Sequence, residues 1–443
     1  MKKILSLILA MCLVFAVAAC AVETPPAATP APAAPAAEEP AAEAPAAEAP
    51  AAETPAEETT AEPEPFPYGH LNIATTFPGV IAVITNDVSQ SEEEFRSAQA
   101  LQAKFGADKI VHRTWPAMFA QEGEMMISIM REVAAIEDLS AVIINQAVVN
   151  TNAAVDALMS MRDDVFIVYA SPAENPDDVA MRAHLVLQTN DPLIGRLFVE
   201  QAAQMGVETI AHYSFARHLG VPSIALRREI MMQTAEEFGI AFEDLEATDP
   251  QGDGGVPATM MHITQDLPRQ VERLGPNTAF FGTNCAMQGP MIAQVVFHGA
   301  MYVQPCCPSP YHGYPTALGV TALVDSGQVD EDGEAIMRFR DMNEVIQATR
   351  DRVAELDMTG RVSGWPVPGA GMWSNVGVMY AIQWLNGNVP EEHGNIDFEM
   401  VSALSWQFIE EQGERGNASW DSFTLEGRNF PNWALAAMPY ILY

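Results

Sequence analysis

A strand, a loop and a helix follow one another in residues 81–105, IAVITNDVSQSEEEFRSAQALQAKF. The apolar run Ile81–Ile84 predicts a buried strand, and Glu92–Phe105 has the acidic start and the periodicity of a helix. The same alternation recurs along the chain. Continuous Val, Ile and Ala runs between amphipathic helices are typical of a parallel sheet that is covered on both faces. The expected fold class is therefore α/β and doubly wound.

Further strands are predicted at 109–112, 141–144, 165–169 and 185–188, which complete a first series. A second series begins after residue 188, with strands predicted at 209–213, 241–245, 278–281 and 301–304. Further helices are predicted at 125–136, 152–161, 193–205, 225–238, 264–274, 291–297 and 396–411. The body of about 377 residues exceeds what one hydrophobic core normally serves, so two Rossmann-like lobes in tandem are expected.

The N-terminus has the pattern of an export signal. Lys2 and Lys3 precede an apolar run, which ends in small residues immediately before Cys20. This pattern resembles the bacterial lipobox, so residues 1–20 are interpreted as a lipoprotein signal peptide and Cys20 as the acylated residue. The alternative is an uncleaved membrane anchor, but the apolar run is shorter than the ~20 residues that span a bilayer.

Residues 21–66 are almost entirely Ala, Pro, Glu and Thr, without Lys or Arg. Such a segment cannot bury enough apolar area to offset the entropy of ordering, so a disordered tether is predicted. The body after it holds 48 acidic and 20 basic residues, a net charge near −28. This charge repels nucleic acid, which is therefore excluded as a partner.

Cysteines are few. With Cys12 in the signal and Cys20 lipidated, only Cys285, Cys306 and Cys307 remain in the body. Either Cys285 pairs with one of the other two, or all three are free thiols. The histidines do not fall at metal-like spacing, so neither a metal site nor a cofactor is predicted.

The loops after the predicted strands share amides, hydroxyls, aromatic rings and one Arg. In parallel sheets, ligands bind beyond the carboxyl ends of the strands. The candidate ligand-binding residues are therefore Asn86, Asp87, Trp115, Asn145, Gln146, Ser171, Asn190, Arg217, Asn284, Tyr311 and Trp365. Such residues also cap helices and form turns, the tryptophans also suit core packing, and Arg217 also suits a surface ion pair.

Three segments resemble the type I periplasmic solute-binding proteins, the family of the ribose-binding receptors of ABC importers. Residues 188–195, QTNDPLIG, resemble the first hinge of that family, and residues 280–287, FFGTNCAM, resemble a segment that approaches the ligand, with Cys285 in place of Asp. Residues 365–387 resemble the segment that returns to the first lobe. The family's acidic residue after the 301–304 strand is replaced by Cys306, Cys307 and Pro308.

This resemblance implies two lobes joined by a three-segment hinge, with crossings near 188–191, 362–365 and 387–390. Residues 67–189 and 364–389 would form the N-terminal lobe, and residues 190–363 and 390–443 the C-terminal lobe. Within the superfamily, the chain looks similar to a lipoprotein branch known only as a domain of unknown function.

The implied function is a lipid-anchored solute receptor on the extracytoplasmic face of the cell membrane. It would close over a small polar ligand and deliver it to an ABC permease. A sensor that signals to a receptor kinase or chemoreceptor would use the same fold. An exported hydrolase is the third hypothesis, but the chain contains no Gly-x-Ser-x-Gly elbow, so no catalytic residues are assigned and the protein is not expected to be an enzyme.

Overall fold

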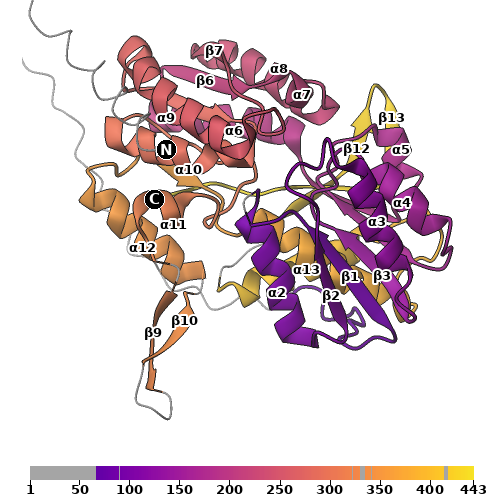
Figure 1. Ribbon diagram of the computed structural model, residues 1–443. Coiled ribbons are helices and arrows are strands. Elements are labelled where there is room, and N and C mark those ends of the chain that lie inside the picture. Colours follow the sequence, from indigo (N-terminus) through magenta and orange to yellow (C-terminus); the bar gives the residue numbers. More distant parts are fainter. Residues whose placement is uncertain (1–65, 89, 322, 330–334, 341, 414–417) are drawn as a thin grey trace, which may run out of the picture. The chain divides into compact units, whose positions relative to one another are not determined.

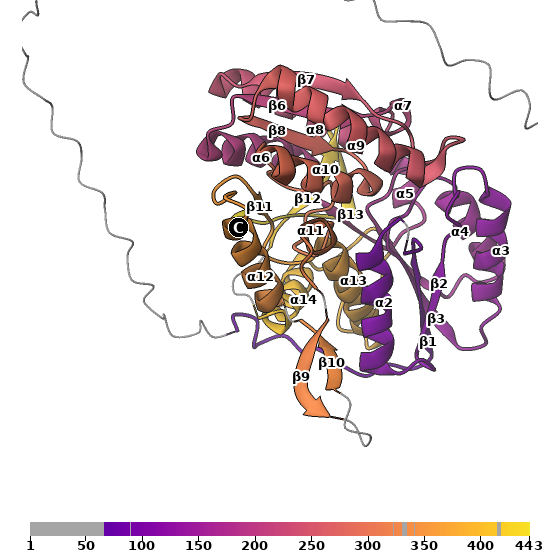
Figure 2. The same cartoon turned by 60° about the vertical axis from the view of Figure 1, so that its left-hand side comes forward.

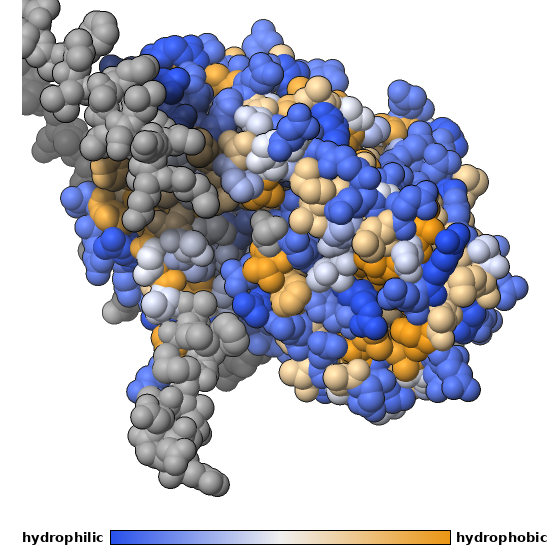
Figure 3. Space-filling view, viewed as in Figure 1, coloured by the Kyte–Doolittle hydropathy of each residue, from blue (hydrophilic) through white to orange (hydrophobic). Residues whose placement is uncertain are grey.

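The computed structural model describes residues 66–443, apart from residues 89, 322, 330–334, 341 and 414–417. The predicted signal peptide, Cys20 and all but the last residue of the predicted tether lie outside the described residues. Among the helices that are described, none has the length and apolar character required to cross a bilayer. The face of the protein in Figure 3 is covered mainly by hydrophilic residues, and apolar residues form separate patches on it.

The first lobe is built on a seven-stranded sheet in the order β12-β13-β5-β4-β3-β1-β2. Five of these strands run parallel and overlap the predicted ones (Figure 1). They are β1 (Val80–Thr85), β2 (Ile110–Thr114), β3 (Leu139–Ile144), β4 (Phe166–Ala170) and β5 (Leu185–Thr189). The predictions succeed here because the central strands contain continuous apolar runs and are buried on both faces.

Alternate residues of β1 enter two different cores. Ile81 and Val83 pack with helices α2, α13 and α14, while Ala82 and Ile84 pack with α3 and α4 on the opposite face. This alternation follows from the two-residue period of a strand. The covering helices are α2 (Glu92–Phe105), α3 (Gly123–Ala134), α4 (Thr151–Met159), α13 (Gly369–Leu385) and α14 (Phe398–Glu411), with the short α5 (Pro176–Ala180) beside β13.

The second lobe has a three-stranded parallel sheet in the order β7-β6-β8 (Figure 2). Its strands are β6 (Thr209–Ser214), β7 (Ala241–Glu246) and β8 (Thr278–Gly282). Helices α6 (Asp191–Met205) and α8 (Pro222–Phe238) pack on one face. Helices α9 (Gly255–Leu274), α10 (Cys285–His298), α11 (Tyr314–Leu318) and α12 (Met342–Glu355) pack on the other. The two lobes confirm the predicted doubly wound α/β fold of type I periplasmic-binding-protein character.

The second lobe differs from the prediction in several places. Helices α11 and α12 were not predicted, and α9 begins nine residues before the predicted 264. The strand expected at 301–304 forms only isolated bridges, between Met301 and Ala279 and between Tyr302 and Val362. An antiparallel pair, β9 (Leu323–Val329) and β10 (Ala335–Phe339), was not predicted, and Figures 1 and 2 both show it extending away from helix α12.

The chain passes between the lobes three times. The first passage follows β5 and enters α6, within the predicted 188–191. The second lies between β11 (Ser363–Gly364) and α13, which begins at Gly369, so it starts at the end of the predicted 362–365. The third leads from β13 (Arg428–Ala437) to β14 (Ile441–Leu442), which pairs with β11.

The predicted third crossing at 387–390, and the assignment of residues 390–443 to the second lobe, are therefore wrong. Helix α14 packs on α13, and β13 lies parallel to β5 in the first-lobe sheet. The physical reason is the run Trp433–Ala437, which is buried throughout and extends the sheet beyond β5, with β12 (Ser419–Leu425) pairing antiparallel at its edge. Only the last residues return to the second lobe, where Tyr443 contacts Tyr314 with ring centroids 5.0 Å apart.

Candidate functional site

A cavity lies between the two lobes, and its volume is about 850 Å³ including the space at its open mouth. Its walls come from loops at the carboxyl ends of β1, β3, β4 and β5 in the first lobe and of β6 and β8 in the second. The polar residues on these walls include Asn86, Gln90, Gln146, Ser171, Gln188, Asp191, Arg217, His218, Ser223, Arg227, Thr283 and Asn284. Converging amides, hydroxyls and charges within a concave site are what a small ligand requires.

Two polar residues on the first-lobe wall have a left-handed backbone. Gln146, after β3, has a φ of 61°, and Ser171, after β4, has a φ of 46°. Residues other than glycine adopt this region rarely, at a cost of about 1–3 kcal/mol, and such residues concentrate at ligand sites. The strained turns place both residues on the cavity wall.

Asn86 carries an unsatisfied group on the same wall. Its side chain is 5% exposed, and within the described part of the chain its Oδ1 has no hydrogen-bond partner. Its backbone N–H is occupied, since it donates to Glu94 Oε2 at 3.3 Å. A buried acceptor without a partner loses its hydration without compensation, and Asn86 is one of the residues that line the cavity.

Arg217 on the second-lobe wall is held in an ion pair. Its Nε and Nη2 donate to the two carboxylate oxygens of Asp249 at 2.9 and 2.7 Å, and its guanidinium lies 5.1 Å from the centre of the Phe215 ring. Short helix α7 (Ala216–Leu219) carries the residue. The ion-pair alternative for Arg217 is thus realised in the structure, and the side chain still lies on the cavity wall.

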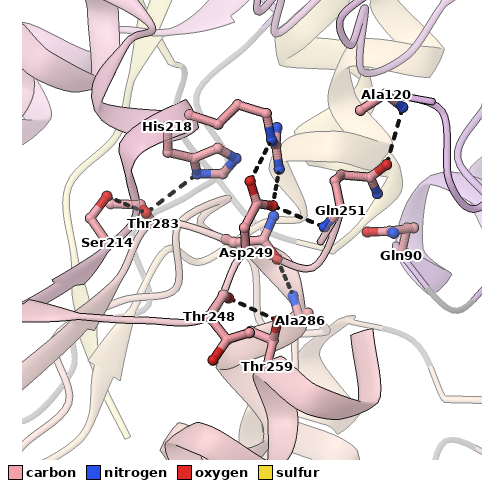
Figure 4. Close-up of polar contacts among 12 residues, drawn as sticks. Gln90, Ala120, Ser214, His218, Thr248, Asp249, Gln251, Thr259, Thr283 and Ala286 are labelled. Carbon is pink, nitrogen blue, oxygen red and sulfur yellow. Dashed lines mark hydrogen bonds and ion pairs between the residues drawn. The ribbon is translucent and has the colours of Figure 1, made fainter. Parts of the chain in front are cut away.

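His218 follows Arg217 on α7 and also lines the cavity. Its Nδ1 lies 3.3 Å from Thr283 Oγ1, which in turn lies 2.9 Å from Ser214 Oγ (Figure 4). Burial, reinforced by the neighbouring Arg217 charge, lowers the pKa of His218 to about 3. The ring is therefore neutral at physiological pH and offers a polar but uncharged surface.

A buried ion pair lies beside the first passage between the lobes. Arg227 Nη1 donates to Asp191 Oδ1 at 2.5 Å, and both side chains are less than one-tenth exposed. Gln188 Nε2 donates to the other Asp191 oxygen at 3.1 Å and to Ser223 Oγ at 3.1 Å. These bonds connect β5, α6 and α8 at the edge of the cavity.

Five of the eleven predicted ligand-binding residues line the cavity, namely Asn86, Gln146, Ser171, Arg217 and Asn284. Asp87 does not, and its Oδ1 accepts a hydrogen bond from the Gln90 backbone N–H at 3.1 Å in the turn before α2. Asn190 does not either: it caps α6 by accepting from the Leu193 N–H at 3.1 Å. Both act as the turn and cap residues that the sequence also allowed.

The remaining predicted residues lie away from the cavity walls. Trp115 and Trp365 are 1% and 0% exposed and belong to the hydrophobic cores, because a large ring after a strand can fold back on the sheet. Asn145 donates to the Ala370 carbonyl oxygen and Ser374 Oγ at 2.7 and 2.6 Å, and so joins β3 to α13. Tyr311 donates to the Arg340 carbonyl oxygen at 3.2 Å.

Three thiols form a second candidate site, which the sequence did not predict. Cys285, Cys306 and Cys307 are free thiols that line the cavity, and their ligand atoms and that of His312 all lie within 4.8 Å of one another. Burial raises the pKa of Cys306, but thiol hydrogen bonds from Cys285 and Cys307 outweigh it and lower that pKa below its usual value. The four residues form a donor set that can hold a metal ion.

Two acidic residues of α2 lie near this cluster. Glu94 is fully buried, and burial, with the nearby Cys307 thiol, raises the pKa of its carboxyl well above the ordinary value. Glu93 accepts a hydrogen bond from the Gly371 backbone N–H at 2.9 Å, and burial raises its pKa as well. The sequence showed both only as the acidic first turn of a helix.

Comparison with known proteins places the chain among uncharacterised relatives. An "Uncharacterized protein" of Treponema pallidum (strain Nichols) is 29% identical over 195 residues, which cover 43% of this chain and 87% of that protein. A solved structure, "Putative transcriptional regulator from Clostridium difficile 630", has a TM-score of 0.61 at 16% identity and covers 83% of this chain and 100% of that one. It supports the fold alone.

A sugar ABC transport substrate-binding protein from Bordetella parapertussis 12822 aligns with a TM-score of 0.47 at 11% identity, over 84% of this chain and 90% of that one. The family described as "Protein of unknown function (DUF3798)" matches residues 80–363, which is more than half of the chain. The matched range contains both lobe sheets up to β11 and every residue named on the cavity walls. The chain therefore belongs to the DUF3798 family.

Proposed function

We propose that the chain is a lipid-anchored, extracytoplasmic solute-binding protein that closes its two lobes over a small polar ligand and delivers it to an ABC-type importer. The observation that carries this proposal is the cavity whose polar walls come from both lobes, at the carboxyl ends of the strands of their two parallel sheets. A ligand that touches both walls favours the closed arrangement by the difference in its affinity for the two forms.

The chemistry of the walls favours a neutral or anionic polar metabolite. Asn86 supplies an unpartnered acceptor, and Gln90, Gln146 and Asn284 add further amides around it. Amides both donate and accept hydrogen bonds, which suits hydroxyl and carbonyl groups. Arg217 is already paired with Asp249, so any anionic group on the ligand would meet a cation whose charge is largely balanced.

The outer location and the membrane partner rest on the N-terminal sequence. Lys2, Lys3, the apolar run and Cys20 form the pattern of a lipoprotein signal, and Ala-Pro-Glu residues follow it. Acyl chains at Cys20 would retain the protein at the membrane surface without a spanning helix. A permease at the same surface is the partner that would accept the released ligand.

A thermal-shift screen of the purified chain against sugars, nucleosides, amino acids and small carboxylates tests the binding role. A ligand that binds only the folded form raises stability by about 2.7 kcal/mol at 100 times its dissociation constant, so the melting temperature rises measurably. We expect a hit among neutral or anionic compounds. If only strongly cationic compounds raise the melting temperature, the assignment of this cavity is wrong.

Two matched Asn→Ala variants separate binding from stability. Asn86→Ala should abolish the ligand-induced shift and leave the stability of the free protein nearly unchanged, because the lost oxygen has no protein partner. Asn175→Ala should keep the shift and lower stability by about 1 kcal/mol, because Asn175 Oδ1 caps α5 by accepting from the Asp177 N–H at 2.9 Å. The same loss of ligand response in both variants would contradict the proposed site.

Delivery is tested in cells with the compound that the screen identifies. Deletion of the gene should remove uptake of the labelled compound, and uptake should return with the wild-type chain but not with Asn86→Ala. Unchanged uptake together with a lost signalling response would show a sensor instead of a transport receptor.

A further inference from the structure

We propose that Cys285, Cys306, Cys307 and His312 bind one thiophilic metal ion, with Zn²⁺ as the reference ion, in the second-lobe wall of the cavity. The residues come from two segments that are separate in sequence, and their ligand atoms all lie within 4.8 Å of one another. This site adds to the proposed function and does not depend on it.

The three sulfurs have the spacing of a tetrahedral metal site. The Sγ atom of Cys285 lies 3.7 Å from that of Cys306 and 3.8 Å from that of Cys307, and the latter two are 3.9 Å apart. Tetrahedral Zn–S bonds of about 2.3 Å separate two sulfurs by about 3.8 Å, whereas a disulfide requires about 2.05 Å. The nearly equilateral triangle therefore matches three thiolates on one ion and does not match any pairwise bridge.

His312 supplies the fourth donor of the set through one of its ring nitrogens. Its Nδ1 lies 2.9 Å from the carbonyl oxygen of Cys307. Because a carbonyl oxygen can only accept, Nδ1 carries the hydrogen, and Nε2 keeps the lone pair that a metal requires. A metal-binding histidine commonly donates its other N–H to a backbone carbonyl in this way, which fixes its tautomer and its orientation.

The local fold brings the two segments together. Cys285 is the first residue of α10, immediately after the Asn284 cap, which accepts from the Ala286 N–H at 2.9 Å. The loop of His312 lies directly on α10, because a Cβ atom on Gly313 would lie 3.1 Å from Ile292 Cδ1. All four donors belong to the second lobe, so the ion can bind whether the lobes are open or closed.

The donor set selects the class of ion. Three thiolates and an imidazole suit Zn²⁺ and Cu⁺, whereas Mg²⁺ and Ca²⁺ prefer oxygen ligands. Four protein ligands complete a tetrahedron, which is the arrangement of a structural site. The ion would join the start of α10 to the 306–312 loop under the cavity, where Gln146 of the first lobe also approaches Cys307 Sγ at 3.5 Å.

Metal analysis of the full chain, purified under reducing conditions with zinc in the medium, tests this proposal. We expect one zinc per chain. Replacement by Co²⁺ should give the intense visible absorption of a tetrahedral centre and the near-ultraviolet charge-transfer bands of thiolate ligands. Added Zn²⁺ should also raise the melting temperature of the metal-free protein.

Variants assign the metal to these residues. The triple variant Cys285→Ser, Cys306→Ser and Cys307→Ser removes all three thiols of the cluster, so any zinc left in it is bound elsewhere in the chain. Loss of a residue that only hydrogen-bonds a metal ligand weakens metal binding about 10–100-fold. Cys306→Ser and His312→Gln each remove a ligand itself, so each should weaken Zn²⁺ binding by at least that factor. The exposed His298 on α10 gives the control His298→Gln, which should bind zinc as the wild type does.

Three results would overturn the proposal. They are equal zinc content in the wild type and the triple variant, a six-coordinate cobalt spectrum, and a mass lower by two hydrogens in the unreduced protein, which would show a disulfide. The thermal response to solutes is measured in a separate experiment. If the wild-type protein contains and binds no zinc but still binds its solute, the metal site is rejected and the proposed function is retained.

Discussion

The side-chain oxygen of Gln251 accepts a hydrogen bond from the backbone N–H of Ala120 at 3.1 Å, between a second-lobe loop and a first-lobe loop (Figure 4). The Gln251 amide nitrogen donates to the Ala117 carbonyl oxygen at 3.0 Å. Its side chain is only 3% exposed, so both bonds are shielded from water. The Gln251 backbone N–H in turn donates to Asp249, the partner of Arg217 on the cavity wall. This residue therefore links a first-lobe loop to the second-lobe wall of the cavity.

Gln251→Ala should shift the protein toward an open arrangement. The change removes two shielded hydrogen bonds, each contributing about 1 kcal/mol, and leaves the Ala117 oxygen and the Ala120 N–H without this partner. We expect a larger radius of gyration by small-angle X-ray scattering and an apparent ligand affinity lowered at least about 10-fold.

Gln233→Ala is the matched control, because Gln233 is exposed on α8 and its amide donates to Glu229, one turn earlier on the same helix, at 3.1 Å. It should leave both measurements at the wild-type value. An unchanged radius and affinity in Gln251→Ala would show that this contact does not hold the lobes together.

Arg227→Met should lower the free energy of unfolding by about 3–5 kcal/mol. The substitution leaves the Asp191 carboxylate buried and without its cation, and this is the costly way to break a buried pair. Urea denaturation measures the loss. Adding Asp191→Asn to Arg227→Met should recover part of it, because the buried charge is then removed.

Arg228→Met is the control from the adjacent position of α8. Arg228 pairs with Asp244, and the side chains are 28% and 47% exposed, so its loss should cost no more than about 1 kcal/mol. Similar losses for the two arginines would refute the distinct role of the buried pair.

Most of the alternating strands and helices as far as α10 could be predicted from the sequence, because most of these elements bury a continuous or periodic apolar face. The short helices α5 and α7 were not predicted, and neither α7 nor β7 contains a fully buried residue. In the C-terminal part, helix α14 could be predicted, but strands β12 to β14 could not. Residues 420–443 have no clear period, since β13 gains its stability from a partner, β5, that lies more than two hundred residues earlier. The third passage between the lobes was therefore placed too early.

The candidate site was predicted in part for a similar reason. The ends of parallel strands converge, so Gln146 and Ser171 could be assigned to one region from the order of the predicted strands alone. Whether a side chain then turns toward the cavity or the core depends on packing from other elements, and this separates Gln146 from the buried Trp115. The sequence led us to consider the three cysteines only as a possible disulfide or as free thiols, because the spacing of Cys285, Cys306, Cys307 and His312 matches no common metal motif.

Gly195→Ala should destabilise the second lobe. A Cβ atom at this position of α6 would lie 2.7 Å from the Arg227 carbonyl oxygen and 3.2 Å from Ile230 Cβ, so α6 and α8 would have to separate. Overpacking costs about 1–3 kcal/mol, and better helix propensity returns about 1 kcal/mol. We expect a net loss of up to about 2 kcal/mol in the free energy of unfolding, measured by urea denaturation.

Gly289→Ala should raise the free energy of unfolding, the opposite of the effect expected for Gly195→Ala. Among the described residues, no atom outside the neighbouring backbone of α10 lies within 4 Å of a Cβ atom built at this position, so the substitution adds helix propensity without a clash. A gain of about 0.5–1 kcal/mol is expected. If both glycine variants change stability in the same direction, then the close packing of α6 on α8 does not explain why residue 195 is glycine.

Acid should weaken the first lobe through His184. Its Nδ1 accepts a hydrogen bond from the Ile167 backbone N–H at 3.1 Å, which requires an unprotonated nitrogen. Burial, with a smaller effect of the nearby His393, lowers its pKa from 6.5 to about 4. Between these two values the unfolded chain binds a proton that the folded protein does not. The free energy of unfolding therefore falls as the pH falls from about 6.5 to about 4. Above about pH 6.5, neutral His184 makes its full contribution to stability.

His184→Gln isolates this contribution, because glutamine keeps an acceptor for the Ile167 N–H and does not titrate. Urea denaturation at pH 7 and pH 4.5 should show a loss in the wild type that exceeds the loss in the variant by about 2 kcal/mol, allowing for the partial exposure of the ring. His298→Gln, on the other lobe, should retain the wild-type dependence. Parallel curves for the wild type and His184→Gln would mean that His184 is protonated in the folded protein at pH 4.5, and that its bond to Ile167 does not hold the ring neutral.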